Sequence, residues 1–112
     1  MSEGRLPTEI WLTAGLRRCS NDGIPATVVR RGEKQSGTVA LKLNQREAGC
    51  RVLTQGRDAD GKLTWFAALD GALVDEAEAD AYLERTASRD PDIWIIEIEH
   101  RDGWHPFEDG LF

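Results

Sequence analysis

Two carboxylates and a histidine near the end of the chain are the residues best suited to chemistry. Glu97 and Glu99 occupy alternate positions of an apolar run, and His100 follows directly. Alternate residues of a strand project from one face about 6–7 Å apart, and paired carboxylates at that spacing can perform acid–base chemistry. One hypothesis is therefore a small hydrolase or nuclease that uses Glu97, Glu99 and His100. The alternative is a strand that leaves the core here and exposes both carboxylates to water.

A metal site is the second chemistry to consider. His100 and His105 are the only histidines, and Glu97, Glu99 and Asp102 lie near them in the sequence. Their spacing does not match a helical zinc motif, and a metal needs three or four converging ligands. No nucleotide-binding glycine pattern is present either. We therefore expect neither a metal nor a cofactor.

Charge is divided unevenly along a chain whose formal net charge is −6. Residues 1–62 carry 11 Lys and Arg against 7 Asp and Glu, whereas residues 63–112 carry 3 against 13. If the two halves segregate in space, the protein presents a basic side and an acidic side. Such sides favour charged partners.

Two arginine pairs dominate the basic half, Arg17-Arg18 and Arg30-Arg31. They could contact phosphates, which makes nucleic-acid binding a further hypothesis. Aromatic side chains that stack on single-stranded bases are missing there, apart from Trp11, which the pattern assigns to the core. The alternative reading is a solvated face or a contact with an acidic protein.

The C-terminal tail, residues 104–112, is unusually apolar for a chain end. Unanchored termini are usually small and polar, but this one carries Trp104, Phe107, Leu111 and Phe112. We expect the tail to fold back over its own sheet, on the face that holds Ile93 and Ile95. In the alternative arrangement it docks into a partner or a second copy, which would give a homodimer. Aromatic anchors favour interface centres, and these would be Trp104, Phe107 and Phe112.

The elements that position these residues begin with a helix, a stop and a strand near the end of the chain. Asp75 and Glu78 have the spacing of a capping box, and Pro91 cannot continue a helix. Residues 93–98 follow, dense in Ile and Trp, with apolar residues on both faces at the start. This pattern predicts an internal strand.

An earlier helix starts near Thr8, a candidate N-cap, and stops near Gly23, which suits a left-handed cap. Gly15 in its middle costs about 1 kcal/mol relative to alanine, which predicts close packing against the sheet or the second helix. Four strands follow with short polar connectors, which predicts an antiparallel meander. We place Lys42 on the outward side of the second one. The four ranges are 26–31, 38–44, 50–55 and 62–69.

We therefore predict an α+β fold, a mainly antiparallel sheet of about five strands with two helices packed on one face. The helices should meet through two apolar sets, which are Trp11, Leu12 and Leu16 against Ala79, Tyr82 and Leu83. A chain of 112 residues predicts a single domain. We expect residues 1–7 to be a loose lead-in.

The cellular compartment is predicted from the lack of a membrane span and of a signal peptide, and from the two cysteines. No run approaches the ~20 apolar residues of a membrane span, and the first residues lack the character of a signal peptide. Cys19 and Cys50 show no metal or redox spacing, so we expect two reduced, buried thiols. The prediction is a cytoplasmic protein without membrane contact.

Several segments resemble the domain of unknown function 1491 family of small alphaproteobacterial proteins. The blocks EAEADAYL and DPDIWIIEIE are the specific part of this resemblance. The similar segments are TEIWLTAGLRR (8–18), VVRRG (28–32), GTVALK (37–42) and EAEADAYLERTASRDPDIWIIEIEHRDG (76–103). The resemblance implies a bacterial cytoplasmic protein with one compact domain, and it supplies no activity, cofactor or catalytic residue.

The function predicted from these observations is a non-catalytic protein-interaction module that works through its charged faces and its aromatic tail. The hydrolase or nuclease hypothesis and nucleic-acid binding by the basic half are the alternatives. The partner is an unidentified protein or a second copy of the chain.

Overall fold

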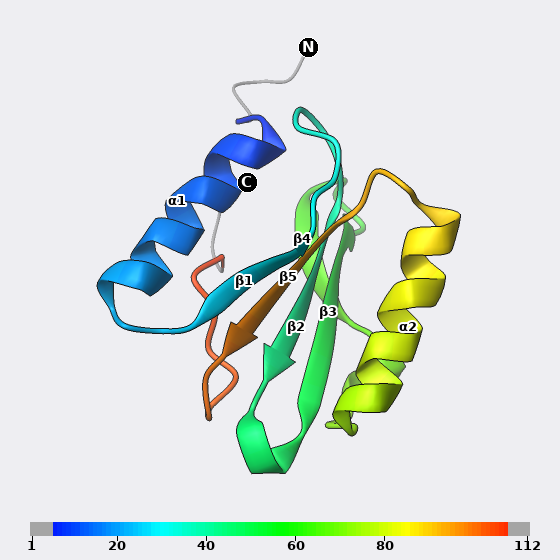
Figure 1. Ribbon diagram of the computed structural model, residues 1–112. Coiled ribbons are helices and arrows are strands. Elements are labelled where there is room, and N and C mark those ends of the chain that lie inside the picture. Colours follow the sequence, from blue (N-terminus) through cyan, green and yellow to red (C-terminus); the bar gives the residue numbers. More distant parts are fainter. Residues whose placement is uncertain (1–5, 108–112) are drawn as a thin grey trace.

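In the described part of the chain, a five-stranded sheet carries one helix on each face (Figure 1). The structure is a computed structural model that describes residues 6–107. The helices and strands are α1 (Thr8–Asn21), β1 (Ala26–Arg30), β2 (Val39–Asn44), β3 (Cys50–Arg57), β4 (Leu63–Ala67), α2 (Glu76–Arg89) and β5 (Trp94–Glu99). Two short 3-10 turns, η1 (Arg46–Ala48) and η2 (Leu69–Gly71), complete the connections.

The strand order is β1-β5-β2-β3-β4. Strands β2, β3 and β4 form an antiparallel meander, and β5 lies antiparallel to β1 and parallel to β2. The α+β class and the internal position of the last strand are confirmed. The meander of four consecutive strands is wrong, because β5 lies between β1 and β2. The apolar residues on both faces of β5 suit this internal position, where strands pair with both of its edges and a helix covers each face.

The two helices cover opposite faces of the sheet, so the prediction that they pack together on one face is wrong. On the α1 face, Trp11 and Leu12 join a core with Val39, Leu41, Leu43, Trp94, Ile96 and Ile98. On the α2 face, Ala79 and Leu83 join Ala40, Cys50, Val52, Ile93 and Ile95. Successive residues of a strand point to opposite faces of the sheet. Because β2 and β5 are apolar on both faces, each face of the sheet needs a helix to cover it.

The described part of the C-terminal tail folds back on the protein, as expected. Phe107 is fully buried in the α1-side core, and its carbonyl accepts a hydrogen bond of 3.0 Å from Nε1 of Trp65. The expected location was wrong, since residues 104–107 bring Phe107 to the α1 face and not to the face of Ile93 and Ile95. That second face is covered by α2. Phe112 lies outside the described residues.

The N-terminus of α2 is capped as predicted, whereas that of α1 is not. The Asp75 side chain accepts a 2.9 Å hydrogen bond from the Glu78 amide and caps α2 as predicted. Thr8 is the first residue of α1 and not its cap, because its hydroxyl donates to the Gly37 carbonyl at 2.9 Å. This bond ties the helix to the loop before β2. Within residues 6–107 neither helix is long and apolar enough to cross a membrane.

Candidate functional site

A groove of about 580 Å³ separates α2 from the edge of the sheet formed by β1 and β5. We call it the acidic groove, because four carboxylates and two cations line it. The lining residues are Val29, Arg30, Lys42, Glu76, Asp80, Leu83, Glu84, Ala87, Ile95 and Glu97. Apolar and charged groups therefore line the same cavity.

One wall of the groove is a stripe of acidic residues on α2. Glu76, Asp80 and Glu84 recur every four residues and therefore share one face of the helix. Leu83 and Ala87 lie beside them and supply the apolar part of the wall. This periodicity places three carboxylates in a row that rises about 6 Å per step.

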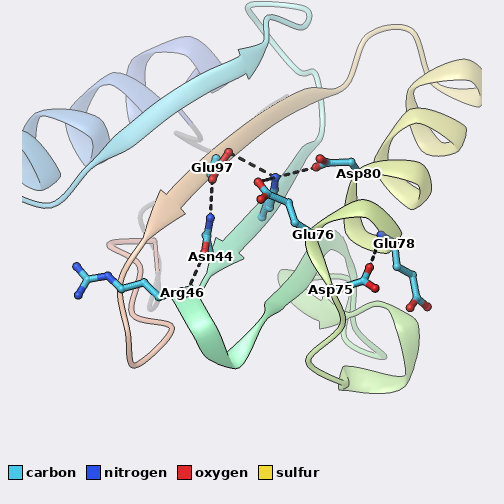
Figure 2. A network of polar contacts seen from close by, with 8 residues as sticks. Asn44, Arg46, Asp75, Glu76, Glu78, Asp80 and Glu97 are labelled. Carbon is cyan, nitrogen blue, oxygen red and sulfur yellow. Dashed lines mark hydrogen bonds and ion pairs between the residues drawn. The ribbon is translucent and has the colours of Figure 1, made fainter.

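Lys42 is the cation at the centre of the site and is only 4% exposed. Its Nζ lies 2.7 Å from Oε2 of Glu76, 2.7 Å from Oδ1 of Asp80 and 3.6 Å from Oε1 of Glu97. Figure 2 shows these carboxylates converging from α2 and β5. Lys42 thus joins the helix to two strands of the sheet.

The protonation of Lys42 follows from these contacts. Burial by itself lowers the pKa of a lysine, but hydrogen bonds to Asp80 and Glu76 and the charge of Glu97 outweigh it. The net effect raises the pKa of Lys42 above its ordinary 10.5. A lysine acts as a nucleophile or a base only when neutral, so this one serves as a permanent positive charge.

Glu97 and Glu99 share one face of β5 as predicted, but they serve different contacts. Glu97 Oε2 accepts a hydrogen bond from Asn44 Nδ2 at 3.0 Å, and its other oxygen faces Lys42. Glu99 Oε2 pairs with Arg46 Nε at 3.2 Å. Figure 2 shows Asn44 between Glu97 and Arg46. Only Glu97 lines the acidic groove.

The histidines lie away from the groove. His100 Nδ1 accepts from the Asp102 amide at 3.1 Å, and its ring lies 5.9 Å from that of Trp104. His105 is 5% exposed, and its Nδ1 accepts from the Phe107 amide at 3.1 Å. Across residues 6–107 no cluster of three His, Cys, Asp or Glu could hold a metal ion. The structure does not bring Glu97, Glu99 and His100 to a common cavity.

The predicted basic residues lie on two faces. Arg17 and Arg18 are exposed on α1, and the Arg18 guanidinium lies 5.3 Å from the centre of the Trp104 ring. Arg31 packs on Trp94 at 5.4 Å and pairs with Glu9. Arg17, Arg18 and Arg31 therefore belong to the α1 side.

Arg30 points the other way and lines the acidic groove. Its Nη2 donates a 2.7 Å hydrogen bond to the carbonyl of Pro91. Its Nε is buried and has no hydrogen-bond partner among the described residues. Arg30 therefore places a positive charge at the end of the groove near the C-terminus of α2.

The sequence of the whole described region matches one family. The family model described as "Protein of unknown function (DUF1491)" covers residues 6–108. The chain belongs to this family. No curated protein matches it.

Solved DUF1491 structures share the fold. A crystal structure of a DUF1491 family protein from Caulobacter crescentus CB15 is 39% identical, with a TM-score of 0.82, and the match covers 93% of this chain and 96% of that one. An NMR structure of a DUF1491 family protein from the same organism gives 39% identity and 0.80, with 94% of each chain covered. Protein Atu0922 from A. tumefaciens is 24% identical over 86% of each chain, with a TM-score of 0.70, and shows the fold alone.

Sequence analysis of this DUF1491 protein missed the acidic groove. The alternation of the strand places Lys42 on an outward face, where it would be solvated, whereas the structure buries it. Two signals could have found the site. One is a lysine between Leu41 and Leu43 in an apolar strand, and the other is the four-residue repeat of carboxylates on α2.

Proposed function

We propose that this DUF1491 protein is a non-catalytic protein-interaction module that binds a basic segment of a partner protein in the acidic groove. The observation that carries the proposal is the imbalance of charge around the cavity. Four carboxylates face it, whereas Lys42 is already surrounded and Arg30 lies at one end. A cationic partner would complement the remaining negative charge.

The carboxylates of the groove keep acceptor capacity. Their side chains are 58% exposed at Glu76 and 54% at Asp80, and each carboxylate offers about four lone-pair sites. A lysine or arginine of the partner could therefore bind them without displacing Lys42. The half-buried setting would strengthen such charge-assisted hydrogen bonds relative to open water.

The apolar part of the groove would contribute affinity as well. Val29 is 54% exposed on β1, and Ala87 and Ile95 line the same cavity. Burying such surface against a partner supplies a non-directional gain of about 25 cal/mol per Å². A binding segment would combine positive and apolar side chains.

Chemical arguments favour binding over catalysis at this site. Lys42 remains charged, and Glu97 is held by two donors. Burial raises the pKa of both cysteine thiols above their usual 9.0. The charge of Asp22 adds to this effect at Cys19. At Cys50 the charge of Lys42 opposes the effect but does not cancel it. Little thiolate forms at neutral pH in such surroundings. The two free, buried cysteines also support the cytoplasm as the compartment in which we propose the protein acts.

A titration monitored by NMR tests the proposal. Lysine-rich peptides with interspersed leucines are added to labelled protein at ~50 mM salt, where screening is weak. We expect amide shifts concentrated at the residues of the acidic groove. An absence of shifts there with every basic peptide would overturn the proposal.

Two glutamates of α2 provide a matched pair of variants. Glu84 lines the groove, whereas Glu78 lies outside it and points away from the cluster in Figure 2. Glu84→Gln should weaken peptide binding about threefold, the effect of one partly exposed ion pair. Glu78→Gln removes the same charge from the same helix and should leave affinity unchanged. Equal losses in both variants would mean that the peptide reads only net charge, and the groove would be rejected.

A further inference from the structure

We infer that the segment bound in the acidic groove is an amphipathic helix that lies beside α2 and parallel to it. The inference rests on the function proposed above and names the shape and direction of the partner segment. It draws on the position of α2 on its face of the sheet, the spacing of the carboxylates, and the charges at the two ends of the groove.

Space for a second helix exists beside α2. The buried residues of α2 pack on Ala40 of β2, on Cys50 and Val52 of β3, and on Ile93 and Ile95 at the start of β5. Figure 1 shows α2 nearest to β3 and distant from β1. The groove begins beside this contact, at Ile95 and Glu97 of β5, and extends over Val29 and Arg30 of β1. A helix laid there at the usual interaxial distance of about 8–10 Å would complete the layer that α2 begins.

An added strand fits this edge of the sheet less well than a helix. The register of β1 against β5 shifts between Val28 and Arg30, and such a bulge interrupts the regular ladder that a further strand would extend. β1 is also only five residues long. These are features that discourage pairing along the β1 edge.

The carboxylate stripe fits basic residues on a helix. Glu76, Asp80 and Glu84 are separated by four residues each, a rise of about 6 Å per step. Lysines at positions i, i+4 and i+8 of a partner helix repeat that rise, so each could face one carboxylate. The apolar side of the same helix would pack on Val29 and Ala87.

Charges at the ends of the groove set the direction. Glu76 and Asp80 lie in the first turns of α2. Arg30 donates a hydrogen bond to the carbonyl of Pro91, just beyond the C-terminal end of α2. A helix has a partial positive charge at its N-terminus and a partial negative charge at its C-terminus. Parallel alignment brings the first end to the carboxylates and the second to Arg30.

Three synthetic peptides of identical composition test the shape. Each contains lysine, leucine and alanine with one proline. The first carries lysines at i, i+4 and i+8 on one helical face, with its proline at the first helical position, where a helix tolerates it. The second has scrambled lysine positions, and the third has its proline in the centre, which breaks the helix. The first should bind about tenfold more tightly than either control, the effect of losing about two ion pairs.

The outcomes separate the two proposals. If all three peptides bind the groove equally, the partner is not read as a helix, and this inference fails while the proposed function stands. If none binds, both fail. A nitroxide at the N-terminus of the first peptide should broaden the amide signals at Ala77 and Glu78, and one at the C-terminus those at Ser88 and Arg89. The reverse pattern would overturn the parallel direction.

Arg30 and Arg31 supply a charge-matched pair for the C-terminal end of the partner helix. Arg30→Gln should weaken binding of the first peptide about threefold, as expected for loss of a cation at a helix C-terminus. Arg31→Gln removes the same charge on the α1 side, where Arg31 pairs with Glu9, and should have no effect. Unchanged affinity in a folded Arg30→Gln variant would contradict the assigned role.

Discussion

The ring of Phe107 occupies the space that a side chain at Gly15 would need. A Cβ on Gly15 would overlap Cε1 of the Phe107 ring, far inside contact distance. Phe107 is fully buried and meets Trp11 edge to face at 5.4 Å between ring centres. The glycine inside α1 therefore makes room for the C-terminal segment, and neither the sheet nor α2 is the neighbour that explains it.

This relationship predicts a reversal of helix propensity. Alanine normally stabilises a helix interior by about 1 kcal/mol relative to glycine. Here Gly15→Ala should destabilise the protein by about 1–3 kcal/mol, the usual effect of overpacking a core. In a Phe107→Ala background the same substitution should become stabilising. Urea denaturation of the four proteins measures the coupling, and an equal loss in both backgrounds would show that Phe107 is not the clashing group.

Phe107 also anchors the end of the chain to the core. Phe107→Ala should lower the free energy of unfolding by about 3–5 kcal/mol. Because the contact is intramolecular, the lowered melting temperature should not depend on protein concentration. A variant that melts like the parent, or whose melting temperature rises with concentration, would indicate that the tail docks on another molecule.

Local signals predicted the elements of this fold well. The Asp75 cap, the stop at Pro91 and the apolar run of β5 each depend on neighbouring residues, and all appear in the structure. Alternation also separated the two faces of β5 correctly. What it could not supply was the identity of the cover on each face, because both helices offer a similar apolar stripe.

Local patterns mark single residues of the acidic groove, but they do not show that these residues come together. Lys42 lies on β2, Asp80 on α2 and Glu97 on β5, and no local pattern joins three separate elements. Strand order decides the matter, since β5 pairs with β2 and brings Glu97 opposite Lys42. Phe107 likewise meets Gly15 only because the tail crosses the α1 face.

The cap of α2 provides a test of local stability. Asp75→Ala removes the acceptor of the 2.9 Å bond from the Glu78 amide and should cost about 1 kcal/mol. Amide exchange at Ala77 and Glu78 should accelerate, while that of β5 changes no more than global stability requires. Asp75→Asn keeps a capping oxygen and should restore most of the protection. Slow exchange in the alanine variant would mean that the cap contributes nothing.

Glu33, in the loop before β2, should contribute to stability in a way that is lost in acid. Its carboxylate accepts hydrogen bonds from the amides of Gln35 at 2.9 Å and Ser36 at 2.8 Å, and these lower the pKa of Glu33 below its usual 4.5. The resulting stability is present above pH 4.5 and is lost as pH falls through the lower, folded-state pKa. Glu33→Gln should therefore reduce the melting temperature at neutral pH, and the two melting curves should converge on acidification. A gap that persists in acid would exclude the carboxylate as its source.

Lys42 should make the stability of the protein depend on pH in the alkaline range. Lys42→Met removes a buried ammonium and leaves Glu76, Asp80 and Glu97 facing one another. Because two of these carboxylates are more than half exposed, the loss should be about 2–3 kcal/mol, somewhat below that of breaking a fully buried pair. Arg46→Gln, which breaks the exposed pair with Glu99, should cost about 0.5 kcal/mol by comparison.

The pH dependence of the Lys42→Met deficit separates a bound charge from simple packing. A raised folded-state pKa means that the stability from Lys42 is fully present below the unfolded value of 10.5 and is lost as pH rises through the folded one. The difference in unfolding free energy between parent and variant should therefore stay constant from neutral pH to about 10 and shrink only above 10.5. If the difference shrinks well below 10.5, the pKa of Lys42 is not raised. If it persists unchanged into strong alkali, the methylene chain and not the ammonium stabilises the groove.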